Sequence, residues 1–182
     1  MTLLTVGHGT LGADELASLL DDAQVELLVD IRSYPGSRHN PQFGREAMAA
    51  WLPESGIAYE WQPALGGRRR PRPDSRNTAL TNEAFRGYAD YMETPEFADG
   101  VERLLERAHE RRAAVMCSES VWWRCHRRLL SDAVLLLHQV PVEHLFHTGR
   151  LEPHHPLAEV RVESGRLVYD GGAPSLPGLG AG

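Results

Sequence analysis

Short apolar runs alternate with helical patterns along most of this chain, and this alternation restricts its fold more than any other feature. Residues 3–6 form an apolar run closed by Gly7, and residues 25–29 form another that ends in Asp30. Between them, residues 13–23 carry leucines at the spacing of a helix. Runs that are apolar at every position are typical of strands buried on both faces of a parallel sheet. The chain is therefore expected to open with a βαβ unit.

The same alternation continues to residue 146. The patterns predict further strands at residues 57–61, 113–116 and 142–146, further helices at residues 45–52 and 124–138, and ordered structure at residues 82–92. Another helix is expected to begin at Pro95 after an N-cap at Thr94, and Asp14 is the expected N-cap of the first helix.

The end of the chain follows a different pattern. Residues 158–163 and 166–169 flank Ser164 and Gly165, a two-residue connection that predicts a β-hairpin. Together the patterns predict an α/β fold, a three-layer Rossmann-like domain with a mainly parallel sheet flanked by helices, plus the C-terminal β-hairpin. This single domain is expected to span residues 1–170, and residues 171–182, rich in glycine and proline, to form a flexible tail.

Length and composition exclude several classes of protein. The 182 residues suit one domain, and the two cysteines are too few for the disulfide framework of a small secreted protein. No apolar run approaches the ~20 residues that cross a bilayer, so we expect a cytoplasmic protein without a membrane partner. All 19 basic residues are arginines, which rules out a Schiff-base lysine and a phosphate-loop lysine. The formal net charge of -6 argues against general wrapping of nucleic acid.

Chemically capable side chains follow three of the expected strands. His8 follows the first strand, Asp30 and Arg32 end the second, and Cys117 and Glu119 follow the strand that begins at residue 113. Ligands of open α/β sheets bind beyond the carboxyl ends of the strands. We therefore expect these segments to meet at one edge of the sheet and to form a site there. Structural roles stay open for His8, as a tie between loops, and for Asp30 and Arg32, as an ion pair that fixes a loop.

The densest group of such side chains lies at the end of a strand, the following loop and the start of a helix. A thiol near a helix N-terminus and several arginines forms the reactive thiolate more readily, so cysteine nucleophilic chemistry is expected. A carboxylate there can transfer protons, and arginines can neutralise an anionic substrate. The predicted catalytic residues are His8, Cys117, Glu119, Cys125, His126 and Arg127.

Two other interpretations of the same residues stay open. Cys125 shares a helical spacing with Leu129, so it can be a small core residue. Two cysteines with His126 and His8 supply four nominal metal ligands, but their spacing matches none of the familiar zinc patterns. No metal ligand is therefore assigned.

A basic cluster lies in an expected long loop between residues 63 and 81. Such a run is usually a solvated loop, but its arginines can also bind the phosphates of a nucleotide or nucleic acid. The two tryptophans at 122 and 123 can stack a base or belong to the core. The predicted ligand-binding residues are Gly7, Asp30, Arg32, Arg38, Gly66, Gly67, Arg68, Arg69 and Arg124.

A set of motifs from residue 3 to residue 169 resembles the bacterial and archaeal family called domain of unknown function 488. The motifs are Thr5-Val-Gly-His8, Leu28-Val-Asp30-Ile-Arg32 with Pro35 and Ser37, Asn40-Pro-Gln-Phe43, Leu65-Gly-Gly67, Tyr88-Ala-Asp90-Tyr91, and Cys117-x-Glu119 followed by Cys125-His126-Arg127. The resemblance implies an α/β domain of Rossmann-like layering and no established activity. Gly9 stands where many relatives have serine, and residues 121–123 also depart from the family pattern.

The leading hypothesis is an enzyme that acts on a phosphate-bearing ligand, a nucleotide or a nucleic acid, through a Cys/Glu/His/Arg site at the carboxyl edge of the sheet. One alternative is a nucleotide or nucleic-acid binding module without catalysis. A second alternative is a thiol-redox or metal-binding protein. The sequence names no cofactor and no oligomeric state.

Overall fold

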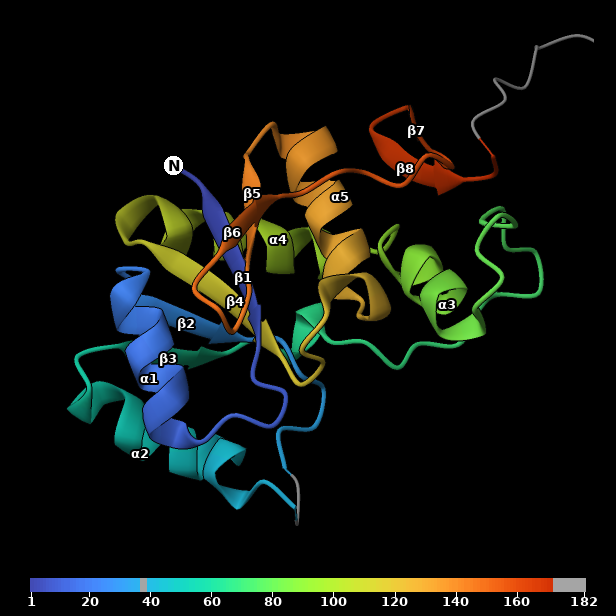
Figure 1. The fold of residues 1–182 in the computed structure, drawn as a ribbon. Coiled ribbons are helices and arrows are strands. Elements are labelled where there is room, and N and C mark those ends of the chain that lie inside the picture. Colours follow the sequence, from blue (N-terminus) through green and yellow to red (C-terminus); the bar gives the residue numbers. More distant parts are fainter. Residues whose placement is uncertain (37–38, 172–182) are drawn as a thin grey trace, which may run out of the picture.

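The computed structural model describes residues 1–36 and 39–171, and a six-stranded sheet lies at its centre (Figure 1). The strand order is β3-β2-β4-β1-β5-β6. The strands β1 to β5 run parallel, whereas β6 pairs antiparallel with β5 at one edge. Their bounds are β1 (Leu3–Gly7), β2 (Leu27–Asp30), β3 (Ala58–Trp61), β4 (Ala113–Cys117), β5 (Val142–Leu145) and β6 (Leu151–Pro153).

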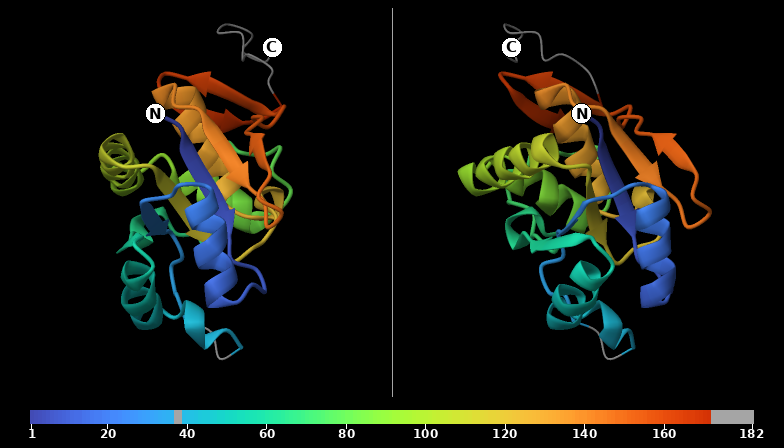
Figure 2. Two further views of the ribbon diagram at one scale, coloured as in Figure 1. Left: turned by 60° about the vertical axis from the view of Figure 1, so that its left-hand side comes forward. Right: turned by 90° about the vertical axis from the view of Figure 1, so that its left-hand side faces the viewer.

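Five α-helices in the described part of the chain flank this sheet, which confirms the predicted α/β fold. The right-hand view of Figure 2 shows α1 and α4 on opposite sides of the strands. The helices are α1 (Ala13–Asp22), α2 (Arg45–Glu54), α3 (Glu83–Tyr91), α4 (Pro95–Glu110) and α5 (Arg127–His138).

The strands supply apolar side chains to both faces of the sheet, as the continuous apolar runs predicted. In β1, Leu4 and Val6 pack with the leucines of α1 and the buried face of α2. Leu3 of the same strand joins the other core, to which α3, α4 and α5 contribute. Each fully buried leucine or valine contributes roughly 1.5–3 kcal/mol relative to an exposed one, so the two cores fix the helices on either side.

The C-terminal hairpin forms as predicted, with β7 (Val160–Glu163) paired antiparallel with β8 (Arg166–Tyr169). Ser164 and Gly165 connect the two strands with φ angles of 50° and 75°. Two positive φ angles are the requirement of a type I′ turn, the connection whose twist matches that of a hairpin. Tyr169 is buried in the core of α3, α4 and α5, so the hairpin is packed on the domain.

The helix starts differ from the predictions at two places. Asp14 is not the N-cap of α1; Gly12 takes that position, and its backbone N–H donates to Glu15 Oε2 at 2.6 Å. Thr94 caps α4 as predicted, because its Oγ1 accepts from the backbone N–H of Phe97. The helix expected from residue 124 begins only at residue 127, since the 3₁₀-helix η3 (Trp122–Arg124) precedes it.

The strand β6 was not predicted, because its three residues include a proline and are too few to show a period. Of the predicted tail, residues 172–182 lie outside the described part of the chain. No helix of the described residues combines the length and the apolar composition needed to cross a membrane.

The carboxyl ends of three neighbouring strands are level with one another. Gly7 at the end of β1 pairs with Cys117 at the end of β4, and Asp30 at the end of β2 pairs with Met116. The chain leaves β1 and β2 toward the face covered by α1 and α2, but it leaves β4 toward α5 on the opposite face. Connections that diverge from adjacent strands open a crevice between them, the usual ligand position in open α/β sheets.

Candidate functional site

A cleft of about 510 Å³ lies at this carboxyl edge. This volume falls in the range of ~300–1,000 Å³ that is typical of small-molecule sites. It is lined by side chains from the loops after β1, β2 and β4, from the arginine-rich loop and from the start of α3. The predicted site residues among them are His8, Arg32, Gly67, Arg68, Cys117, Glu119, Arg124, Cys125 and His126.

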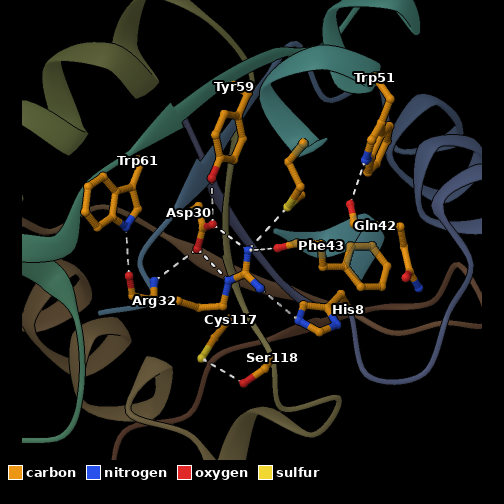
Figure 3. Close-up of polar contacts among 11 residues, drawn as sticks. His8, Asp30, Arg32, Gln42, Phe43, Trp51, Tyr59, Trp61, Cys117 and Ser118 are labelled. Atoms are coloured by element: carbon orange, nitrogen blue, oxygen red, sulfur yellow. Dashed lines mark hydrogen bonds and ion pairs between the residues drawn. The ribbon is translucent and has the colours of Figure 1, made fainter. Parts of the chain in front are cut away.

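Arg32 lines one wall of the cleft and forms an ion pair with Asp30 behind it (Figure 3). Asp30 is 0% exposed, and its two oxygens accept from Arg32 Nε at 2.8 Å and Arg32 NH2 at 2.6 Å. Tyr59 OH donates to the same carboxylate at 2.8 Å. Burial and the negative charge of Asp30 raise the pKa of Tyr59, which therefore stays a neutral donor. This bidentate geometry holds the guanidinium in one orientation.

His8 is held by its neighbours on both ring nitrogens. Arg32 NH1 lies 3.2 Å from His8 Nε2, and His8 Nδ1 lies 3.0 Å from the carbonyl oxygen of Gly9. Since a guanidinium can only donate, Nε2 is the acceptor and the proton is on Nδ1. Burial and the positive charge of Arg32 lower the pKa of His8 to about 4. The ring also stacks on Phe43 at 4.1 Å, so His8 is a neutral group that orients Arg32 rather than an unbonded base.

Two thiols and an imidazole meet on the floor of the cleft. Cys117 ends β4, and its Sγ lies 3.9 Å from His126 Nδ1. Cys125 Sγ lies 3.6 Å from the same nitrogen. Both cysteines are free thiols, and the ligand atoms of all three residues lie within 4.8 Å of one another. Cys125 is buried, as expected of a core residue, but it precedes α5 instead of lying on the face of that helix, and it also lines the cleft.

The two thiols differ in acidity. The hydrogen bond with Cys125 and burial raise the pKa of Cys117 to about 12. Burial also disfavours the Cys125 thiolate, but the bond from Cys117 and the charge of Arg127 outweigh it and lower the pKa of Cys125 to about 6. Cys125 is therefore the more acidic thiol of the pair.

Arg127 does not line the cleft, although it was a predicted catalytic residue. It is 1% exposed, and its guanidinium donates to the backbone carbonyl oxygen of Glu119 from behind the loop. Gly7 stands beside this contact, since a Cβ atom there would overlap that carbonyl oxygen and lie 2.8 Å from Arg127 NH2. Gly7 and Arg127 thus position the loop that carries the exposed Glu119 side chain, which does line the cleft.

The basic side chains of the predicted ligand site separate into two groups. Arg68 and Arg124 are exposed and line the cleft. Arg69 turns away, because its Nε donates to the carbonyl oxygen of Gly66 and its guanidinium lies 3.6 Å over the ring of Tyr91. Arg38 lies outside the described residues.

The glycines of the arginine-rich loop allow close approach of its backbone to the site. A Cβ atom on Gly67 would lie 2.9 Å from His126 Nδ1, and one on Gly66 would overlap the hydroxyl of Ser33. Ser33 donates to the carbonyl oxygen of Gly67 at 2.8 Å, which ties the loop after β2 to this loop. Glycine is therefore required at both positions by the packing around the cleft.

The tryptophans differ in their surroundings. The half-buried Trp122 ring stacks on His144 at 4.1 Å with an interplanar angle of 8°, so that face of the ring is not open to a base. The Trp123 side chain is 43% exposed. Sequence reasoning gave no role to Tyr34, whose ring is 75% exposed at the rim of the cleft. Its position two residues after Arg32, the end of a site motif, was the sequence feature that could have indicated this role.

A buried polar chain behind the cleft was also missed. His144 bonds Thr5 Oγ1 at 2.7 Å and His154 Nδ1 at 3.0 Å, and His154 Nε2 lies 2.8 Å from Asp132 Oδ1. Tyr169 OH donates to the other oxygen of Asp132 at 3.0 Å. Burial, followed by the nearby charges of histidine and arginine, lowers the pKa of His144 to about 3. This chain joins β1, β5, α5 and the hairpin.

The model of one protein family, Domain of unknown function DUF488, matches residues 12–134. This chain belongs to the DUF488 family. The match contains Asp30, Arg32 and the cysteine pair, whereas His8 and the hairpin lie beyond its ends. No curated protein and no solved structure matches the chain. Family membership therefore confirms the resemblance and adds no activity to the site.

Proposed function

We propose that this DUF488 protein is an enzyme that acts on a phosphate-bearing ligand, a nucleotide or a nucleic acid, bound in the cleft at the carboxyl edge of the sheet. One observation carries the proposal: the cleft brings a cluster of two thiols and an imidazole together with a carboxylate and two exposed arginines. Side chains able to bind an anion and side chains able to act as nucleophiles or to transfer protons thus line the same cleft. A site of this composition is the usual starting point for assigning a reaction.

The proposed phosphate-binding groups are Arg68 and Arg124. Both are exposed and line the cleft, and guanidinium groups bind phosphate oxygens through paired hydrogen bonds. Arg32 adds positive charge to the wall, although its carboxylate partner already holds two of its nitrogens. The exposed ring of Tyr34 lies at the rim, 5.9 Å from the Arg68 guanidinium. Stacking on such a ring favours a ligand with a base over inorganic phosphate.

The proposed reaction centre is the cluster of Cys117, Cys125 and His126 on the cleft floor. Thiols and imidazoles supply either a nucleophile or ligands for a catalytic metal. Glu119 is exposed on the same cleft and can carry a proton to or from the ligand.

The second candidate is a binding module for nucleotides or nucleic acid without catalysis. The exposed Tyr34 ring beside the Arg68 guanidinium favours it, because an aromatic face with a cation beside it binds single-stranded nucleic acid without any reaction. Both candidates need the arginines, but only the enzyme needs the cysteine cluster.

The test incubates the full chain with nucleoside mono-, di- and triphosphates and short oligonucleotides, and detects products by mass spectrometry. Cys125→Ser should lower kcat while the ligand Kd stays within about twofold. Arg68→Gln and Arg124→Gln should raise KM, whereas Arg103→Gln on the exposed side of α4 is the matched control and should change neither.

Two results would contradict the enzyme. The first is binding without turnover across the panel, which leaves the binding module. The second is turnover that survives Cys125→Ser in a folded protein, which removes the proposed reaction centre.

A further inference from the structure

We propose that Cys117, Cys125 and His126 bind one Zn²⁺ ion, with a fourth coordination position open to the cleft. The interatomic distances carry this inference. Tetrahedral zinc with Zn–S bonds of ~2.3 Å and a Zn–N bond of ~2.0–2.1 Å separates sulfur from nitrogen by ~3.6 Å and the sulfurs by ~3.8 Å. The observed distances to His126 Nδ1 are 3.6 Å from Cys125 Sγ and 3.9 Å from Cys117 Sγ. The two sulfurs also lie within 4.8 Å of each other, so zinc fits after adjustments of about 1 Å or less.

The composition of the cluster selects the ion. Two thiolates and an imidazole are soft and borderline ligands, which suit zinc and disfavour magnesium or calcium. Three protein ligands with one open position are typical of catalytic zinc, whereas structural zinc has four. Two thiolates also neutralise the charge of Zn²⁺, so the centre does not repel the neighbouring arginines.

The surroundings keep the Nδ1 atom of His126 directed to the sulfurs. Its other nitrogen, Nε2, is buried and has no hydrogen-bond partner among the described residues. The ring lies against Tyr88, with 5.0 Å between ring centroids. Gly67 leaves space beside Nδ1, because a Cβ atom there would lie 2.9 Å away. A larger residue at position 67 would therefore move the imidazole out of the ligand position.

The fourth position faces the cleft, because all three residues line it. His8 does not occupy this position; its two nitrogens are bonded to Arg32 and Gly9. An oxygen atom from water or from a phosphate group is the ligand that the open position would take, with Glu119 on the same cleft to exchange a proton. This catalytic role rests on the proposed function, whereas binding of the ion does not.

The experiment titrates Co²⁺ and then Zn²⁺ into chelator-treated full-length protein. One equivalent of Co²⁺ should give thiolate-to-cobalt charge-transfer absorption and the intense ligand-field bands of tetrahedral coordination. One equivalent of Zn²⁺ should abolish them and protect both thiols from alkylation. These wild-type measurements need no variant to fold. Six-coordinate cobalt spectra, or thiols that remain equally reactive with Zn²⁺, would overturn the inference.

Variants locate the ligands. Loss of a second-shell partner typically costs ~10–100-fold in metal affinity, so Cys117→Ser, Cys125→Ser and His126→Asn should each cost at least about 100-fold. His109→Gln, at an exposed position of α4, is the matched control and should keep wild-type affinity. Wild-type affinity in a folded Cys125→Ser protein would overturn the assignment. Zinc binding without any turnover would contradict the proposed function and leave the metal site standing. Turnover by metal-free protein would support the proposed function and contradict the catalytic role of the ion.

Discussion

Replacing Asp30 with asparagine should destabilise this protein strongly, because it removes the charge that compensates a buried guanidinium. The carboxylate is 0% exposed and accepts from three nitrogens of Arg32, at 3.0 Å from the backbone N–H, 2.8 Å from Nε and 2.6 Å from NH2. Tyr59 OH is a fourth donor. An asparagine would offer one oxygen to these donors and would point its NH₂ group at one of them. Arg32, 8% exposed, would lose its partner.

Breaking a buried ion pair from one side costs about 3–5 kcal/mol, which is a large part of the ~5–15 kcal/mol that stabilises a typical domain. For a chain of this length, the melting temperature should fall by roughly 6–20 °C. The assay is urea unfolding followed by circular dichroism at constant pH. Asp22→Asn, at an exposed position of α1, is the matched control and should change the free energy of unfolding by less than about 0.5 kcal/mol.

A double-mutant cycle separates the ion pair from the hydrogen bond of Tyr59. Tyr59→Phe alone should lower the free energy of unfolding by about 1.5–3 kcal/mol, because a bond to a charged group is lost. The combined loss in Asp30→Asn/Tyr59→Phe should be smaller than the sum of the single losses, since both changes act on one network. A cost below about 1 kcal/mol for Asp30→Asn would refute the reasoning, because it would mean that Arg32 gains equivalent partners from water in the cleft.

Three other changes test separate parts of the structure. Gly7→Ala should cost about 1–3 kcal/mol and weaken ligand binding, because its Cβ would displace the Glu119 backbone; unchanged melting and affinity would contradict this packing. Burial, more than the charge of Arg32, lowers the pKa of His8 to about 4 in the folded protein. Below pH 6.5 the unfolded state therefore binds a proton more readily than the folded state does. The stability that His8 contributes should be complete above pH 6.5 and fall by about 2 kcal/mol at pH 5, and His8→Gln should remove that part of the pH profile. Tyr169→Phe should cost about 1.5–3 kcal/mol in urea unfolding, because Asp132 loses a buried donor; a neutral effect would show that this bond is not needed.

The periodic parts of the fold could be predicted from the sequence because each strand and helix carries its own apolar signal. The runs that became β1, β2 and β4 are buried at every position, which is the pattern expected in the middle of a parallel sheet. The hairpin was predictable for a similar reason, since Ser164 and Gly165 suit the positive φ angles of its turn. By contrast, the start of α5 depended on η3, a short element whose sequence has no period to read.

The location of the cleft was predictable from the sequence, whereas the contacts of its residues were less so. The rule that ligands bind at the carboxyl ends of parallel strands needs only the strand ends, which the sequence marks with Gly7, Asp30 and Cys117. Which side chains face the cleft depends on tertiary contacts. Arg124 faces the cleft, whereas Arg127 is buried behind a loop and the Arg69 guanidinium lies over the ring of Tyr91. The buried chain through His154 combines residues too distant in sequence for any local pattern.

Backbone amide NMR during titration with nucleotides tests the central claim most directly, because it reports where a phosphate-bearing ligand binds. With adenosine and guanosine mono- and diphosphates as probes, shifts should cluster on the cleft at Gly67, Arg68, Ser118, Glu119 and Cys125. Arg68→Gln should weaken the response, and Arg103→Gln should leave it unchanged. Shifts confined to another surface, such as the groove between α4, α5 and the hairpin, or no shifts with any probe, would contradict the assignment of the site.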